Sequence, residues 1–262
     1  SKLKNVINRK LRGKMLQENI KLNPKPIIEC VAEIVFDRNV DILPSAVFGK
    51  VYSELKQKFE DVENLPLYQL PEDIRLSDEN LKNKPWHKFS NKDFDILVGA
   101  TVLAIVVKEP YQRWDIVKEQ INFVFSVFQK VNITNSITRI GLKYIDKFKI
   151  PLINNINLKI ASEIGVNETN ELQLRTILPK KDELIAKIGI MNNVTITYKG
   201  NKESEVSLLD IDIYKNFEEK DSCNFEKAKE IFEKAHLYQK ELFSKLITKE
   251  YLQKNNIKVE NE

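Results

Sequence analysis

The stretch from Asp93 to Lys147 constrains the fold most, because it holds the most apolar sequence in the chain. Its first part, residues 96–107, is too apolar to face water on either side, and Gly99-Ala100 is its natural turn. Residues 111–131 carry apolar side chains at helical spacing and are apolar almost all round in the second half, which predicts a buried helix. An alternating strand follows over 137–148. Two strands, a buried helix and a third strand should therefore form the centre of the fold.

The flanking sequence predicts further strands and two more helices. Alternation over 28–36 predicts a strand with one buried face, and a short strand is predicted at 67–70 inside a polar connection, residues 60–85. The later strands are predicted at 172–178, 185–191, 194–198 and 206–214, with turns at Asn192-Asn193 and Gly200-Asn201. Helices are predicted from Ser45 to Phe59 and from Asn224 to Leu246. The pattern predicts an α+β fold with mostly antiparallel sheet and long helices packed on one face.

The chain divides into two similar parts behind a basic segment. Residues 26–150 form a first α+β half, and residues 151–262 form a second half that ends in a long helix. Each half has hairpin strands followed by a long helix, which suggests two structurally related halves, or one continuous domain across both. Residues 1–25 form a basic amino-terminal arm or an appended tail, and Met15 is an alternative native start.

Composition narrows the class of protein. The two cysteines, Cys30 and Cys223, lie far apart in the sequence and cannot form a disulfide framework or a zinc site by themselves. No uncharged apolar stretch reaches about 18 residues, so no membrane span is predicted. The amino terminus lacks the apolar core of a signal peptide. These features predict a cytoplasmic protein.

The positive charge is concentrated at the amino terminus. Residues 1–25 carry a net charge of +7, whereas the remainder carries −3. A basic arm that binds nucleic acid is therefore one hypothesis, and a solvated terminus is the alternative. The basic side chains concerned are Lys2, Lys4, Arg9, Lys10, Arg12, Lys14, Lys21 and Lys25.

Charged residues at alternate strand positions supply the first candidate site. Glu29 and Glu33 share one face of the first predicted strand, and Arg139 and Lys143 share one face of the strand over 137–148. If these strands are neighbours, the carboxylates should pair across with the cations. Such a ladder is either the floor of a binding cleft or a salt-bridge ladder on a half-exposed sheet.

Asp210 and Asp212 supply a second candidate site, because two carboxylates on one strand face can hold a magnesium ion. Outward-facing aspartates on an antiparallel strand are the alternative. The histidines, His87 and His236, show no metal-ligand or catalytic spacing, and no serine stands in a glycine elbow. The sequence thus nominates no catalytic residue and no cofactor apart from this magnesium hypothesis.

Several stretches together resemble one family. Residues 26–36 are similar to the opening pattern P-I-x-E-x-x-x-E-I-x-F, and residues 139–146 are similar to R-x-G-L-R-Y-I-N, with Lys143 and Asp146 as departures. His236, followed by a segment similar to F-x-x-L-I-T, matches the closing helix. The chain therefore resembles, from about residue 26 to 252, an uncharacterised family distributed sporadically in bacteria and archaea. This distribution implies a phage-defence or toxin–antitoxin setting, and the matching motifs draw attention to His236 as a binding residue.

Three functional hypotheses follow. The leading one is a non-enzymatic binding or accessory protein whose cleft, between the sheet and its long helices, takes another protein or a small ligand. The first alternative is a nucleic-acid-binding protein that uses the arm. The second alternative is a metal-dependent hydrolase or nuclease built on Asp210 and Asp212. The apolar helices could also form a homodimer interface.

Overall fold

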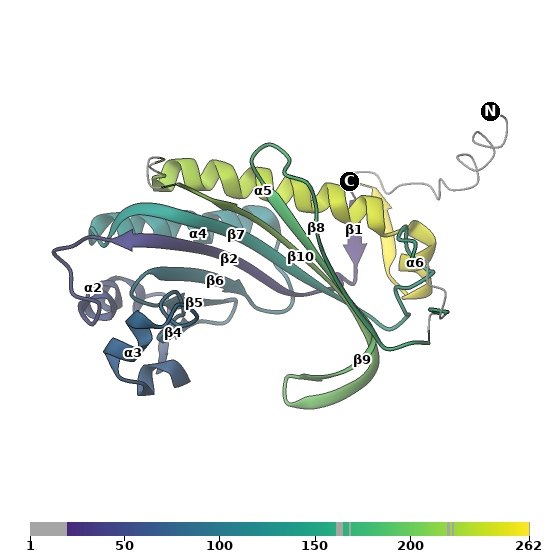
Figure 1. Ribbon diagram of the computed structural model, residues 1–262, viewed down its shortest axis with the longest axis horizontal. Helices are drawn as coiled ribbons and strands as arrows, with labels where there is room; N and C mark the ends of the chain where they lie inside the picture. The colour runs from purple at the N-terminus through teal and green to yellow at the C-terminus, as the bar shows by residue number, and fades with distance from the viewer. Residues whose placement is uncertain (1–19, 161–164, 168, 219–220, 222, 262) are drawn as a thin grey trace.

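One antiparallel sheet of nine strands forms the centre of the computed structural model, which describes residues 20–160, 165–167, 169–218, 221 and 223–261 (Figure 1). The strand order is β3-β4-β5-β6-β2-β7-β10-β9-β8. A separate pair joins β1 to β11. The strands are β1 (Ile20–Asn23), β2 (Ile27–Arg38), β3 (Asp61–Asn64), β4 (His87–Ser90), β5 (Phe94–Val98), β6 (Val102–Val107), β7 (Thr134–Phe148), β8 (Leu172–Ile177), β9 (Ile185–Tyr198), β10 (Asn201–Asn216) and β11 (Lys258–Asn261).

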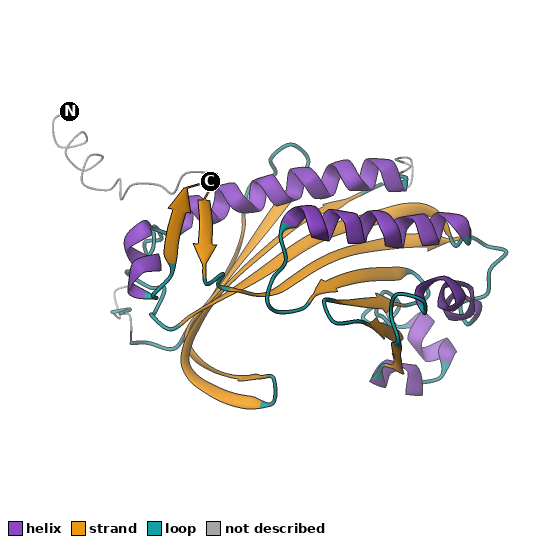
Figure 2. Ribbon diagram, turned by 180° about the vertical axis from the view of Figure 1, so that it is seen from behind, coloured by secondary structure: helices purple, strands orange, loops and turns teal. Residues whose placement is uncertain are grey.

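The long helices lie on one face of this sheet. Figures 1 and 2 show α4 (Trp114–Lys130) and α5 (Phe225–Leu246) side by side on the same face. The shorter helices are α2 (Ala46–Leu55), the 3-10 helix η1 (Pro66–Gln69), α3 (Glu72–Ser77) and α6 (Lys249–Lys254). The predicted class, an α+β fold with mostly antiparallel sheet and helices on one face, is confirmed. Among the described residues, no helix combines the length and the apolar composition needed to cross a bilayer.

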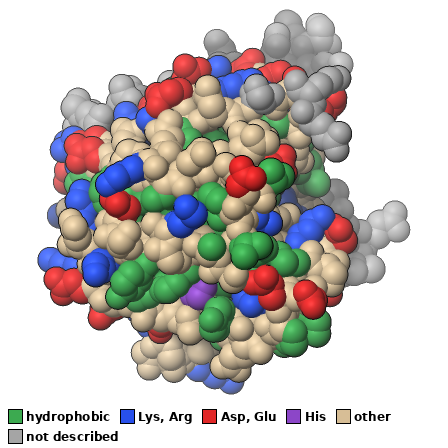
Figure 3. Space-filling model, turned by 90° about the vertical axis from the view of Figure 1, so that its left-hand side faces the viewer, with side chains coloured by type: hydrophobic (Ala, Val, Ile, Leu, Met, Phe, Trp, Pro, Cys, Tyr) green, Lys and Arg blue, Asp and Glu red, His purple; other side chains and the backbone are tan. Residues whose placement is uncertain are grey.

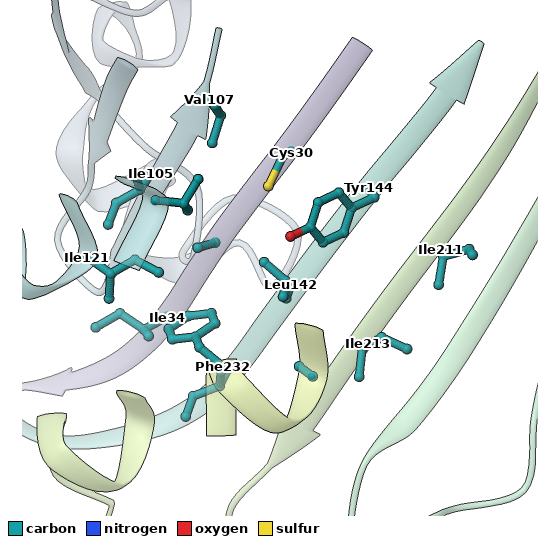
Figure 4. Close-up of a cluster of buried hydrophobic side chains, with 14 of the residues drawn as sticks. Cys30, Ile34, Ile105, Val107, Ile121, Leu142, Tyr144, Ile211, Ile213 and Phe232 are labelled. Atoms are coloured by element: carbon teal, nitrogen blue, oxygen red, sulfur yellow. The ribbon is translucent and has the colours of Figure 1, made fainter. Parts of the chain in front are cut away.

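Alternation along the central strands creates the core. Every second residue of β2, from Cys30 to Phe36, is buried on the helix side. Phe36 packs edge-on against Phe128 of α4, with ring centroids 5.9 Å apart. Figure 4 shows Phe232 of α5 close to Leu142 and to the other buried side chains of the sheet. These side chains fill much of the space between the sheet and the helices, and the cleft expected there stays a prediction.

The sheet continues across the two predicted halves. β7 belongs to the first half and β10 to the second, and they pair from Phe148 opposite Ser207 to Arg139 opposite Asn216. Because this pairing is antiparallel and long, one sheet contains strands from both halves. In this arrangement, one face of β2, β7 and β10 packs against α4 and α5, and the other face points away from them. We call this other, helix-free side the open face.

Two local predictions are wrong. Residues 67–70 lie mainly in η1 rather than in a strand, because Pro66 fixes its own backbone angle and has no N–H to donate to a neighbouring strand. Asn192-Asn193 is not a turn, since β9 runs through it with a register shift against β10. The buried Asn192 side chain instead accepts from Ile153 N at 2.9 Å and donates to Asn170 O at 2.8 Å. The turn predicted at Gly200-Asn201 lies one residue earlier, at Lys199-Gly200, where both residues have positive φ, and Asn201 already pairs with Tyr198 as the first residue of β10.

Candidate functional site

Six of the predicted site residues meet on the open face. Arg139 Nη1 donates to Glu33 Oε1 at 2.6 Å, and Lys143 Nζ lies 3.4 Å from Glu29 Oε1. On the opposite side, Arg139 Nη2 lies 4.0 Å from Asp212 Oδ2, and Lys143 Nζ lies 3.9 Å from Asp210 Oδ2. Each cation of β7 therefore stands between a carboxylate of β2 and a carboxylate of β10. The predicted pairing across strands is confirmed, and we call this set the charged ladder: Glu29, Glu33, Arg139, Lys143, Asp210 and Asp212.

A glycine makes room for the arginine of the ladder. Gly141 follows Arg139 on the same face of β7, and the register places it opposite both Glu33 and Tyr214. A Cβ atom at Gly141 would lie 3.0 Å from Arg139 Nη1. The guanidinium therefore lies across the glycine, where it reaches Glu33 and also stands 5.2 Å from the ring centroid of Tyr214. The spacing arginine, any residue, glycine thus has a local structural reason.

Burial sets the protonation behaviour of the ladder carboxylates, and three further cations, Lys84, Arg175 and Lys187, lie near enough to act on them. Burial raises the pKa of Glu33, and the nearby Arg139 opposes that rise. Burial also raises the pKa of Asp210 and Asp212, against the opposing effect of Lys143 and Arg139 respectively. Partly buried ion pairs of this kind add little net stability. The ladder is therefore better suited to fixing the register of β2, β7 and β10 than to stabilising the fold.

The magnesium hypothesis for Asp210 and Asp212 stays a prediction, because cations already lie near both carboxylates. Each of the two aspartates has a cation within 4.0 Å, namely Arg139 for Asp212 and Lys143 for Asp210. Within the described ranges, no three histidine, cysteine, aspartate or glutamate side chains gather into a group that could hold a metal ion. The geometry around these carboxylates is that of a salt-bridge network.

Substituting alanine for Gly141 should displace the Arg139 guanidinium, because the added methyl group would meet Nη1. We expect the free energy of unfolding in urea to fall by about 1–2 kcal/mol. Gly49 in α2 is the matched control, since nothing lies within 4 Å of a Cβ atom there, and Gly49→Ala should be neutral or stabilising. If Arg139→Gln costs as much in the Gly141→Ala background as in the original chain, the guanidinium has not been displaced.

His236 lies on the opposite side of the sheet from the ladder. It belongs to α5, where its ring stacks on Trp114 at 4.3 Å and its Nδ1 is 3.0 Å from the Tyr144 hydroxyl. Burial, followed by the charge of Lys240, lowers the pKa of His236 to about 4. The histidine is therefore neutral near pH 7 and forms part of the packing between α4, α5 and β7. The ladder and His236 do not form one site.

The hydroxyl of Tyr144 continues this buried polar chain toward β2. It lies 3.2 Å from the Tyr111 hydroxyl, and burial raises the pKa of the neighbouring Cys30 thiol. A thiol with a raised pKa is a poor nucleophile.

Asp146, also on the helix side of β7, is only 1% exposed and its Oδ2 has no hydrogen-bond partner. Burial raises its pKa to about 8.

Most of the proposed nucleic-acid arm, including its residues from Lys2 to Lys14, lies outside the described residues. Lys25, which is described, donates to Tyr111 O at 3.2 Å and stands 5.1 Å from the ring centroid of Tyr111.

A second cluster, which the sequence analysis missed, lies at one end of the sheet. We define the α2–α3 end as residues 39–56 together with 64–87, which appear at the left of Figure 1. Four rings form a continuous series there, in the order Tyr52, Phe48, His87 and Tyr68. The ring centroids of Phe48 and His87 are 4.2 Å apart, and those of His87 and Tyr68 are 4.8 Å apart. His87 Nδ1 is 2.9 Å from Asn64 Oδ1. Burial and the charge of Arg75 lower the pKa of His87 to about 4, so it is neutral near pH 7.

Large apolar side chains are exposed at this same end. Of the nine large hydrophobic residues that are exposed in the described part of the chain, six lie between residues 40 and 74. Val40 is 90% exposed and Leu43 is 69% exposed. In Figure 3, which views this end directly, hydrophobic side chains gather over the lower half among separated charges. The six residues, which we call the apolar patch, are Val40, Leu43, Tyr52, Tyr68, Leu70 and Ile74.

Comparison with known proteins adds no relative. No protein-family model matches the chain, and no curated protein matches it in sequence. The resemblance described from the sequence motifs therefore stays a prediction.

Proposed function

We propose that this protein is a non-enzymatic binding protein that docks a protein partner on its α2–α3 end. The observation that carries the proposal is the concentration of the apolar patch, six of nine exposed large hydrophobic residues, at this one end. Contiguous exposed apolar surface at one place on a protein commonly marks a protein–protein interface. The partner should present apolar side chains, because that is what removes Val40, Leu43 and their neighbours from water.

The composition of the patch supports the same function. Tyr52 and Tyr68 belong to the ring series and contribute large rigid surfaces with a polar edge, and tyrosine is enriched at interfaces. The chain around them is held by the fold: Thr101 Oγ1 donates to Lys82 O at 2.9 Å, and Leu65 N donates to Trp86 O at 2.8 Å. The patch is therefore a preorganised surface.

A photo-reactive amino acid placed at Leu43 tests this function. The full chain is expressed in cells that also contain the proteins naturally present with it. We expect Leu43 to cross-link to one specific protein, whereas the same amino acid at Leu237, which is 57% exposed on α5, should not. The partner, once purified, should bind the original chain at least about tenfold more tightly than the Leu70→Ser, Ile74→Ser variant.

Two outcomes would contradict the proposal. Equal cross-linking from Leu43 and Leu237 would show that the patch has no preferred partner. Cross-linking of Leu43 only to a second copy of this chain would replace the heterologous partner with self-association, which sedimentation of the purified protein would then confirm.

A further inference from the structure

Arg75 is a buried cation without a carboxylate. Its side chain is 6% exposed, and its Nε and Nη1 are enclosed without a hydrogen-bond partner. Among the described residues, no acidic side chain forms an ion pair with it. A buried charge normally has a partner of opposite charge, because its desolvation is otherwise uncompensated. The position of Arg75 therefore calls for a specific reason.

The surroundings of Arg75 supply hydrogen-bond donors and aromatic faces but no anion. The guanidinium carbon lies 3.8 Å from the ring centroid of Trp86 and 5.2 Å from that of Tyr68. Trp86 is 2% exposed, and its indole Nε1 is also buried without a partner. Two unsatisfied donor groups, a guanidinium and an indole N–H, are thus stacked together. An acceptor, preferably a charged one, would compensate the charge of the guanidinium.

Arg75 lies in the segment that carries three residues of the apolar patch. Tyr68, Leu70 and Ile74 are exposed and belong to the same continuous segment as Arg75, from η1 through α3. Because Nε and Nη1 are enclosed, Nη2 is the part of the guanidinium that remains exposed. A ligand that covers Leu70 and Ile74 would therefore pass next to this nitrogen. Charge and apolar surface are presented together.

We propose that the α2–α3 end recognises a polypeptide segment in which an aspartate or glutamate is flanked by apolar residues, with the carboxylate bound by Arg75. This proposal rests on the proposed function and specifies the chemistry of the partner. The carboxylate accepts from the guanidinium, and the flanking apolar side chains cover Tyr68, Leu70 and Ile74. The delocalised charge of arginine is more weakly hydrated than a lysine ammonium, so Arg75 suits a partly buried carboxylate better than lysine does, even through Nη2 alone.

Short random peptides displayed on phage and selected on the full, folded chain test the proposal directly. Selected peptides should carry an acidic residue between apolar ones. Replacing that residue by its amide, Asp by Asn or Glu by Gln, should weaken binding at least about tenfold, as expected for a charge-assisted hydrogen bond. Arg75→Gln should produce a similar loss, and Arg75→Lys a smaller one, whereas Arg139→Gln on the open face should bind like the original chain. The amide exchange changes only the peptide, so it remains informative if an Arg75 variant folds poorly.

The outcomes separate the two proposals. In one outcome, the selected peptides bind the Leu70→Ser, Ile74→Ser variant more weakly, but neither the amide exchange in the peptide nor Arg75→Gln in the protein changes their affinity. This outcome would overturn the acidic recognition and leave the apolar docking surface intact. If no peptide is selected, or if the selected peptides are indifferent to Leu70→Ser, Ile74→Ser, both proposals fail.

Discussion

Asp146→Asn should stabilise the protein by roughly 3–5 kcal/mol near pH 8, the largest effect that we expect from any single substitution. Burial raises the pKa of Asp146 to about 8 in the folded protein, compared with an ordinary value of 3.8. The native state therefore retains a proton that the unfolded chain loses. Asparagine removes this difference, and it is also the residue at this position in the motif that residues 139–146 resemble.

The pH window follows from the sign of this shift. Between about pH 4 and pH 8 the folded state binds more protons than the unfolded state, so stability falls as the pH rises and the full penalty is reached above about pH 8. Below about pH 4 the aspartate is protonated in both states and costs nothing. The nearest titratable groups, Cys30, Tyr111 and Tyr144, have pKa values raised by burial and stay neutral across this window. These three groups therefore do not titrate together with Asp146 in this window.

Urea unfolding of the original chain and of Asp146→Asn at about pH 5 and about pH 8 checks this prediction. The stability difference should grow by roughly 3–4 kcal/mol between the two conditions. Because the ladder carboxylates are present in both proteins, their contributions cancel from the difference. Asp182→Asn, at an exposed position, is the control and should show no such growth. A difference that does not change with pH would mean that Asp146 ionises normally in the folded protein.

Arg75→Met should also stabilise the isolated protein, by about 2 kcal/mol, while it abolishes acidic-peptide binding. Methionine fills a similar volume against Trp86 without the uncompensated charge, and apolar replacement of buried charges is often stabilising. The lost stacking of the guanidinium on Trp86 offsets part of this gain. Denaturant unfolding of the free proteins measures the net effect.

Arg139→Met provides the contrasting control. Arg139 is paired with Glu33 at 2.6 Å, so its removal leaves a partly buried carboxylate without its cation and should lower the free energy of unfolding. Opposite signs for the two arginines would support the proposal that the charge of Arg75 is compensated by a ligand carboxylate. If both substitutions destabilise the protein to the same extent, Arg75 is a packing residue and the peptide hypothesis loses its energetic basis.

Much of the architecture could be predicted from the sequence because the central elements have unambiguous periodicity. The alternation in β2 permits one buried face, and the charged ladder follows once β2 and β7 are neighbours. The spacing in α4 predicts the helix, but Asn122 and Ser126 are exposed, so α4 has one buried face instead of burial almost all round. His236 could not be placed in the same way. Its side of the sheet depends on where α5 packs after a long connection, and no local pattern reports that.

Arg75 and Trp86 escaped prediction for a related reason. They are eleven residues apart in a connection that reads as polar and proline-marked, and their unpaired donors become visible only when α3 folds back onto the start of β4. Asn192-Asn193 shows the opposite error, since its local turn chemistry is overruled by tertiary hydrogen bonds to Ile153 and Asn170. Sequence patterns report burial and local turns, whereas unsatisfied groups arise from contacts between distant residues.

The pairing of β1 with β11 has a practical consequence for how the molecule can be held. It brings the first and last described strands together beside α6, at the opposite end of the molecule from α2 and α3 (Figures 1 and 2). A domain fused beyond either strand, or a surface to which either strand is tethered, would stand away from the apolar patch. The molecule is thus built so that an attachment at its ends directs its aromatic, arginine-bearing end outward.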